Sequence, residues 1–166
     1  MTGTIDDTAW QGLIDRQAIQ DVLLRYCRGV DRRDFDLVRS CYHDDAYDLH
    51  GSYEGGPDGF IEHLKRNARW DATMHVIGNQ LIELDGDLAR CESYCISYHR
   101  HEAEAQDMVI GLRYVDRVER RQGEWRIAHR VCAMEWSRVD TVTGLWEFAP
   151  GTVRGQPYPE DILFYK

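Results

Sequence analysis

The sequence predicts an α+β fold in which helices come first and a long antiparallel sheet follows. Two observations predict it. Up to residue 67, apolar residues recur at the three- and four-residue spacing of amphipathic helices. From residue 74 onward, apolar and polar residues alternate, and turn residues separate four long runs of this kind. Helices followed by strands indicate an α+β architecture, with the helices packed on one face of the sheet.

Three helices are expected before the sheet, with a short strand between the second and the third. The first helix has one apolar side and ends near Gly29, before the polar segment 31–34. Glycine and proline at residues 55–57 are a turn signal that precedes the third helix. The expected bounds are residues 8–30, 35–42 and 59–67 for the helices, 46–51 for the short strand, and 74–84, 88–101, 107–121 and 124–138 for the long strands.

The chain is expected to form a single domain over residues 1–166. Its 166 residues, 43% hydrophobic and 30% charged, are typical of one globular domain. The core is expected over about residues 8–138. Residues 139–166 contain glycine and proline, which predict irregular structure, but also apolar side chains such as Trp146 and Phe148. We therefore expect this C-terminal tail to pack on its own or on a neighbouring subunit.

Charge and composition argue against several kinds of partner. The formal net charge is −9, and the paired arginines are flanked by acidic residues, so nucleic acid is not an expected partner. The sequence has no apolar run of membrane-spanning length and no secretory pattern at its beginning, so no membrane partner is expected. Five cysteines form no compact framework, which favours buried thiols and a cytoplasmic location.

His75 gives the first indication of function. The alternation of apolar and polar residues places one set of side chains on the same sheet face: His75, Ile77, Asn79 and Leu81. A lone histidine on a strand is commonly a structural residue of the core or of an interface. Asp31, at the end of the first helix, offers His75 a carboxylate partner, although Asp31 by itself also fits a polar helix end.

Several short segments, in this order, carry a resemblance to a known family. They are residues 18–21 (AIQD), 29–33 (GVDRR), 74–78 (MHVIG), 114–120 (YVDRVER) and 148–152 (FAPGT). With them the chain resembles the SnoaL-like branch of the nuclear transport factor 2-like (cystatin-like) superfamily over about residues 14–151. Within that branch it is most similar to the scytalone dehydratases, the bile-acid 7-alpha-dehydratases and the lindane dehydrochlorinases.

The resemblance implies a fold and a set of site residues. The fold is a cone-shaped α+β barrel with three N-terminal helices packed on a curved, mostly antiparallel sheet, and with a ligand pocket inside. These enzymes use a histidine–aspartate dyad as general base, and the matching positions are His75 and Asp31. Tyr26 matches a catalytic tyrosine of the bile-acid enzymes. The resemblance gives a substrate-binding role to a further set: His50, His99, Tyr114 and Arg130.

Three positions depart from the patterns of these enzymes. His50 stands where the dehydratases have a pocket tyrosine. Tyr26 replaces the catalytic lysine of the dehydrochlorinases, and Thr73 replaces their cysteine. The resemblance therefore favours elimination of water over dehydrochlorination.

The residue types suit such an elimination. A histidine can take the C–H proton, and a carboxylate on its other ring nitrogen fixes the tautomer and stabilises the imidazolium. Tyr26, Tyr114 or His99 can hydrogen-bond a carbonyl or the departing oxygen, although a tyrosine on an apolar helix face is often core. No metal or organic cofactor is required. His99 and His101 share one strand face, but a third metal ligand is not evident.

The sequence thus predicts a cofactor-independent lyase of the dehydratase type, or an isomerase, acting on a cyclic, largely apolar small molecule. Two alternatives stay open: a non-catalytic small-molecule-binding or assembly module of the same fold, and a polyketide cyclase or hydrolase. The strands are apolar on both faces, and the related dehydratases are trimeric. We therefore expect a homo-oligomer, a trimer or alternatively a dimer.

Overall fold

The protein has the expected α+β architecture, with three helices on one side of a six-stranded sheet. The computed structural model describes residues 7–164. Its elements, in chain order, are α1 (Asp7–Arg32), α2 (Phe35–Ser40), β1 (Tyr42–His50), β2 (Tyr53–Gly55), α3 (Pro57–Arg66), β3 (Ala72–Asp85), β4 (Leu88–His101), β5 (Gln106–Arg121), β6 (Glu124–Thr141) and the 3-10 helix η1 (Ile162–Phe164). None of the helices in this part of the chain combines the length and the apolar character that a membrane crossing needs.

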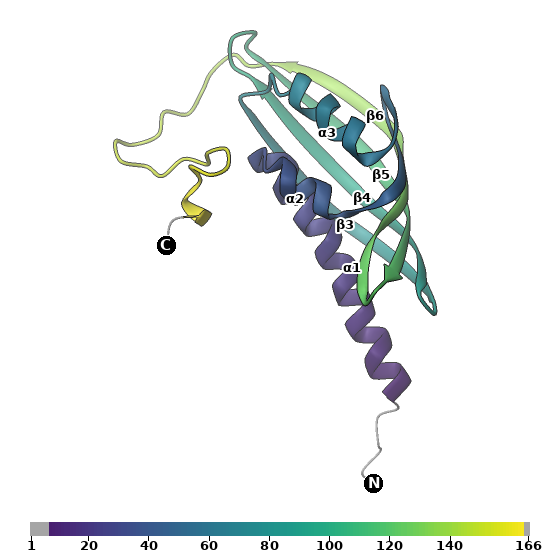
Figure 1. The fold of residues 1–166 in the computed structure, drawn as a ribbon. Coiled ribbons are helices and arrows are strands. Elements are labelled where there is room, and N and C mark those ends of the chain that lie inside the picture. Colours follow the sequence, from purple (N-terminus) through teal and green to yellow (C-terminus); the bar gives the residue numbers. More distant parts are fainter. Residues whose placement is uncertain (1–6, 165–166) are drawn as a thin grey trace.

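The sheet is curved and does not close on itself. Its strand order is β2-β1-β6-β5-β4-β3, so β2 and β3 are the two edges. The pairs are antiparallel except for β1 and β6, which run parallel. Figure 1 shows α1, α2 and α3 on the same side of this sheet, where they leave the opposite face uncovered. We call the helix-covered face the inner face and the opposite one the outer face.

The end of α1 is fixed by local hydrogen bonds and by close packing. Arg33 has φ of 55°, and its N–H donates to the Val30 carbonyl at 3.2 Å, while the Asp34 N–H donates to the Gly29 carbonyl at 2.9 Å. This pair of bonds is a Schellman motif, which ends a helix. The Asp34 side chain then accepts from the Leu37 N–H at 3.0 Å and caps α2. Asp31 is thereby held in the last turn of α1.

The expected face assignment in β3 is correct up to Ile77 and wrong beyond it. Ile77 pairs with Cys95 and Gln80 pairs with Ser93, so two residues of β3 stand opposite one residue of β4. Such a β-bulge shifts the alternation by one residue. Leu81 is therefore 60% exposed on the outer face, instead of sharing the face of His75. The cause is the bulge at residues 78–79, where Gly78 lacks a side chain to pack.

Other boundaries differ from the expected ones. The residues 43–45 do not end α2 but lie in β1, which begins at Tyr42. The expected loop before α3 contains the short strand β2, and α3 begins with Pro57, whose fixed φ suits the first helical position. Asp15 of α1 is buried despite its charge. It accepts hydrogen bonds from the Trp125 indole at 3.0 Å and from Arg120 at 2.8 Å.

The tail beyond β6 contacts the rest of the chain at the end of α1. The Tyr158 N–H donates to the Arg32 carbonyl at 2.6 Å, and Asp161 lies 3.5 Å from the Arg32 guanidinium. Figure 1 shows the tail leaving the end of β6 and extending away from the sheet. Trp146 is 87% exposed, so much of the apolar surface of the tail is not covered within this chain.

Replacing Gly29 should destabilise the junction that holds Asp31. A Cβ at Gly29 would lie 2.7 Å from a Val38 methyl group and 3.0 Å from the Val38 backbone nitrogen. We expect Gly29→Ala to lower the free energy of unfolding by about 1–3 kcal/mol, as overpacking usually does. Gly12→Ala, also in α1, is the control, because its Cβ would meet its nearest atom at 4.0 Å. Urea unfolding of both variants tests this, and equal stability of the two would contradict it.

Candidate active site

A pocket of about 200 Å³ lies between the inner face of the sheet and the helices. This is smaller than the roughly 300–1,000 Å³ of pockets for drug-sized ligands, so it suits a molecule with one or two rings. Most of its walls are apolar or aromatic, and a few polar side chains point into it. The residues that line it are Tyr26, Val30, Arg33, Phe35, His50, Phe60, His63, Leu64, Asn67, Ala68, Trp70, Thr73, His75, Ser97, His99, Ile110, Leu112, Tyr114 and Met134.

Asp31 and His75 meet at the wall of this pocket. The Asp31 Oδ1 lies 2.6 Å from the His75 Nδ1, and the Asp31 Oδ2 accepts the His75 backbone N–H at 2.9 Å. The Thr73 hydroxyl donates to the same carboxylate at 3.1 Å. Because Nδ1 faces the carboxylate, Nε2 is the ring nitrogen of His75 that a ligand can reach. The last turn of α1 and the first residues of β3 therefore hold this histidine in one orientation.

The Asp31 carboxylate is kept ionised by its partners. Burial by itself raises the pKa of Asp31, but the hydrogen bonds and the charge of His75, with the Thr73 hydroxyl, outweigh it and hold the pKa below the ordinary range. An ionised carboxylate on Nδ1 stabilises an imidazolium, so it assists His75 when the ring takes up a proton.

Arg130, which was expected to bind the substrate, is not among the residues that line the pocket. It is fully buried beneath the pocket, where its guanidinium forms two hydrogen bonds of 2.8 Å with Asp116. The same guanidinium lies 4.3 Å from the centre of the Tyr26 ring and 4.2 Å from that of Tyr114. Arg130 thus positions the two tyrosines, and truncating one partner of such a buried pair costs about 3–5 kcal/mol.

Tyr26 and Tyr114 lie edge to face on the pocket wall, with ring centres 5.7 Å apart. Burial raises the pKa of both well above the ordinary value, although the nearby Arg130 charge lowers that of Tyr26 in part. Both hydroxyls are therefore protonated donors at neutral pH. The Tyr114 hydroxyl lies near the Cys95 thiol but forms no hydrogen bond of normal geometry with the residues of the described range.

His99 of β4 lies beside His75 of β3 on the same wall of the pocket, with the ring centres 5.6 Å apart in an edge-to-face contact. Burial, helped by the charge of His75, lowers the pKa of His99 to about 4, so this ring is neutral at pH 7. Its Nδ1 is buried without a hydrogen-bond partner among residues 7–164, and the Trp70 ring packs against it. Within the same part of the chain, no three His, Cys, Asp or Glu side chains are grouped to hold a metal ion.

His50 approaches the pocket from β1 and has two close neighbours. Its Nδ1 lies 3.3 Å from the Asp48 Oδ1 and 3.1 Å from the Cys132 sulfur. Asp48 is fully buried and accepts the Tyr42 hydroxyl at 2.5 Å. The sequence analysis did not single out Asp48, although its spacing of two residues from His50 on one strand places both on one face.

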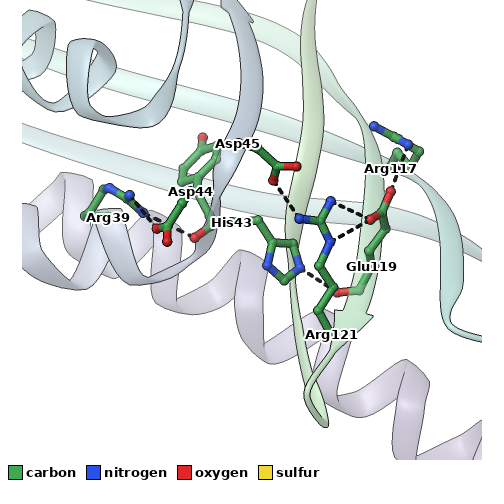
Figure 2. Close-up of polar contacts among 8 residues, drawn as sticks. Arg39, His43, Asp44, Asp45, Arg117, Glu119 and Arg121 are labelled. Carbon is green, nitrogen blue, oxygen red and sulfur yellow. Dashed lines mark hydrogen bonds and ion pairs between the residues drawn. The ribbon is translucent and has the colours of Figure 1, made fainter.

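The acidic residues at the other end of β1 form ion pairs instead. Figure 2 shows Asp44 beside Arg39, at 2.7 Å, and Asp45 beside Arg121, at 2.6 Å. The His43 ring hydrogen-bonds the Glu119 carbonyl at 2.9 Å. These contacts are structural and lie outside the pocket.

Besides the buried Asp48, sequence reasoning missed several residues that line the pocket. Phe60 and Leu64 of α3, together with Trp70 and Met134, line the pocket, and the sequence assigned none of them a place there. Trp70 follows a helix in a segment without periodicity, so no pattern placed its side chain. Met134 lies in β6, where a bulge opposite β5 changes the sheet face to which successive side chains point.

The fold and the site together define a pocket between three helices and a curved, open sheet, with a histidine–carboxylate pair on its wall. The chain belongs to the SnoaL-like domain family, whose model matches residues 11–131. It is 30% identical over 123 residues to an uncharacterized protein of Mycobacterium tuberculosis, covering 70% of this chain and 83% of that one. A protein of Mycobacterium bovis matches with the same figures.

Solved structures share the fold. A hexachlorocyclohexane dehydrochlorinase, LinA type 2, superposes with a TM-score of 0.75 at 23% identity, covering 87% of this chain and 99% of that one. A protein of Novosphingobium aromaticivorans, provisionally assigned as a scytalone dehydratase, superposes with a TM-score of 0.71 at 19% identity. The match covers 82% of this chain and 97% of that one. A protein of unknown function with a cystatin-like fold, from Nostoc punctiforme, superposes with a TM-score of 0.60 at 18% identity. The match covers 74% of this chain and 92% of that one.

The stability that Asp31 contributes should depend on pH. Because its folded pKa is lowered, the contribution is complete above the unfolded value near 4 and is lost as the pH falls through the folded value. At pH 7, Asp31→Asn should reduce the free energy of unfolding by about 1–3 kcal/mol. Urea unfolding between pH 7 and pH 3 should show this difference shrink below pH 4.

The control for this series is Asp36→Asn, which removes an exposed carboxylate from α2. The free energy of unfolding of this variant should differ little from that of the wild type at every pH. A difference for Asp31→Asn that grows on acidification would contradict the assignment of an ionised, hydrogen-bonded carboxylate.

Proposed function

We propose that the protein is a cofactor-independent lyase that eliminates water from a cyclic, largely apolar small molecule, with His75 as general base. The observation that carries this proposal is the contact between Asp31 and the His75 Nδ1 at 2.6 Å, which presents Nε2 to a small, mostly apolar pocket. The structural neighbours named for dehydration and dehydrochlorination support the choice of an elimination.

The substrate class follows from the chemistry of the pocket. A C–H bond is acidic enough for a histidine when it lies next to a carbonyl, so a β-hydroxy ketone fits the site. His75 takes the proton from this carbon, its electron pair forms the new C=C bond, and the C–O bond to the hydroxyl group breaks. The departing oxygen leaves as water with one further proton. Tyr26 and Tyr114, both protonated, can donate hydrogen bonds to the enolate-like oxygen.

The dyad makes a prediction that variants can test. In a wild-type assay with 3-hydroxycyclohexanone as the minimal probe, cyclohex-2-enone should form and be followed by its absorbance. His75→Ala should remove most of the turnover, and Asp31→Asn should lower it by about 10² or more. Because the two residues act as a unit, the double variant should be little worse than His75→Ala alone.

Two results would contradict this assignment. If the fold-loss of turnover in the double variant equals the product of the two single losses, the residues act independently. Binding of the probe without any formation of cyclohexenone would favour a non-catalytic binding module instead.

We also propose that the outer face of the sheet is covered by other copies of this chain, most simply in a trimer. That face carries a group of exposed apolar side chains: Met74, Val76, Leu81, Tyr94, Tyr98, Val115 and Trp136. The Trp136 indole covers Gly111 and is still 49% exposed. The apolar side chains of the tail are also largely exposed within this chain. Self-association commonly buries apolar surfaces such as this tail and the outer face.

Sedimentation of the wild type at micromolar concentration should give a trimer. Val76→Glu places a charge in the outer face and should shift the protein toward monomers. Leu24→Glu is the control, because Leu24 is 48% exposed on α1 at the opposite side of the molecule. A monomeric wild type would refute the proposal.

A further inference from the structure

We propose that His50, held by Asp48, is the general acid of this pocket, which donates the proton to the departing oxygen. This inference rests on the proposed elimination and adds the second proton-handling group that the reaction needs. It assigns a catalytic role to a histidine–carboxylate pair that is separate from Asp31 and His75.

The geometry around His50 is that of a held proton donor. Asp48 and His50 are two residues apart on β1, so both side chains project from the inner face. The His50 Nδ1 lies 3.3 Å from the Asp48 Oδ1 and 3.1 Å from the Cys132 sulfur. The ring forms part of the pocket wall and packs against Phe60, with ring centres 4.8 Å apart. Since Nδ1 faces the buried carboxylate, Nε2 is the nitrogen available to a ligand.

Three buried charged groups lie next to the pair. Beneath the pocket lie two carboxylates, Asp48 and Asp116, and one guanidinium, Arg130, and all three groups are buried. Burial by itself raises the pKa of Asp48, but His50, Arg130 and the Tyr42 hydroxyl outweigh it and lower the pKa. The Asp48 Oδ1 is nevertheless buried without a hydrogen-bond partner of normal geometry in the described part of the chain. The His50 ring is the neighbour placed to donate to it, and a buried charge without a partner is costly.

Among residues 7–164, Asp48 is the one carboxylate among the side chains that lie near the His50 ring. These side chains are Tyr26 of α1, Asp48 of β1, Phe60 and His63 of α3, Tyr114 of β5 and Cys132 of β6, whereas Tyr42 and Arg130 act on Asp48. Burial raises the pKa of Cys132 well above its usual value, so this thiol stays neutral.

The fold places His50 and His75 on different sides of the pocket. Three strands, β6, β5 and β4, separate β1 from β3, which is about 19 Å in a flat sheet at ~4.8 Å per strand. The curvature brings both rings to one pocket. His75 can therefore take the C–H proton while His50 gives the Nε2 proton to the leaving hydroxyl, which departs as water. The proton on His75 then returns to His50 through solvent.

The role of a general acid can be tested with two probes that differ only in the leaving group. 3-Hydroxycyclohexanone must lose water, whereas 3-acetoxycyclohexanone loses acetate, which needs no proton to leave. Both give cyclohex-2-enone. His50→Gln should lower kcat/KM for the hydroxy probe by about 10² or more, and leave that for the acetoxy probe close to the wild-type value. His75→Gln should lower both.

The controls match the variants in chemistry and strand. His129→Gln removes a histidine from β6 that stacks on Tyr47 outside the pocket. Asp45→Asn removes a surface carboxylate from β1, which pairs with Arg121 (Figure 2). Both should keep wild-type rates. Equal losses on the two probes in His50→Gln would overturn the assignment of His50 and leave the proposed elimination intact.

A second measurement is independent of turnover. In ¹⁵N spectra of histidine rings at pH 6.0, the His50 signals, identified by their loss in His50→Gln, should show protons on both ring nitrogens in the wild type. Asp48→Asn should lose the Nδ1 proton signal, and Asp45→Asn should keep it. A bare Nδ1 in the wild type would mean that it accepts from the Cys132 thiol, and would overturn the proposal. If the wild type turns over neither probe, the proposed function fails, and these spectra still decide the state of His50.

Discussion

The contact between the Asp31 carboxylate and His75 is the constraint on which the rest of this site depends. The carboxylate accepts hydrogen bonds from the backbone N–H and from the ring of His75. These two bonds join the last turn of α1 to the edge strand β3. The helix must end at the right residue for this, and the hydrogen bonds around Arg33 and the close approach of Gly29 to Val38 provide that ending. The orientation of the imidazole is thus a consequence of how α1 terminates.

Beneath the pocket lies a second layer, made of buried charges and aromatic rings. Arg130 lies between the rings of Tyr26 and Tyr114 and is held by Asp116, so it fixes the two hydroxyl donors without reaching the ligand. The same layer contains Asp48, which extends the network to His50. Of the four histidines that line the pocket, three lie in clearly different surroundings: His75 against an ionised carboxylate, His50 above the buried charges, and a neutral His99. Different surroundings are how one pocket separates acid from base.

How far the sequence predicts this structure depends on the range of the interactions involved. The spacing of the apolar residues in α1 and the turns between the long strands are local, so these elements follow from the pattern. Asp31 and His75 are far apart in the chain, and only the family resemblance indicated that they meet. The bulge after Ile77 reversed the expected face of Leu81, although a glycine within a strand is a signal of bulges. The position of Arg130 depends on its register with Asp116, which no single strand reveals.

The central claim is that His75 takes a proton from carbon, and hydrogen exchange tests this step apart from elimination. Cyclohexanone has acidic C–H bonds next to its carbonyl but no group to lose, so in D₂O it reports proton removal alone. The account predicts that the wild type exchanges these hydrogens for deuterium faster than buffer does, as followed by proton NMR, and that His75→Gln exchanges them at the buffer rate. Exchange by His75→Gln as fast as by the wild type would contradict the account.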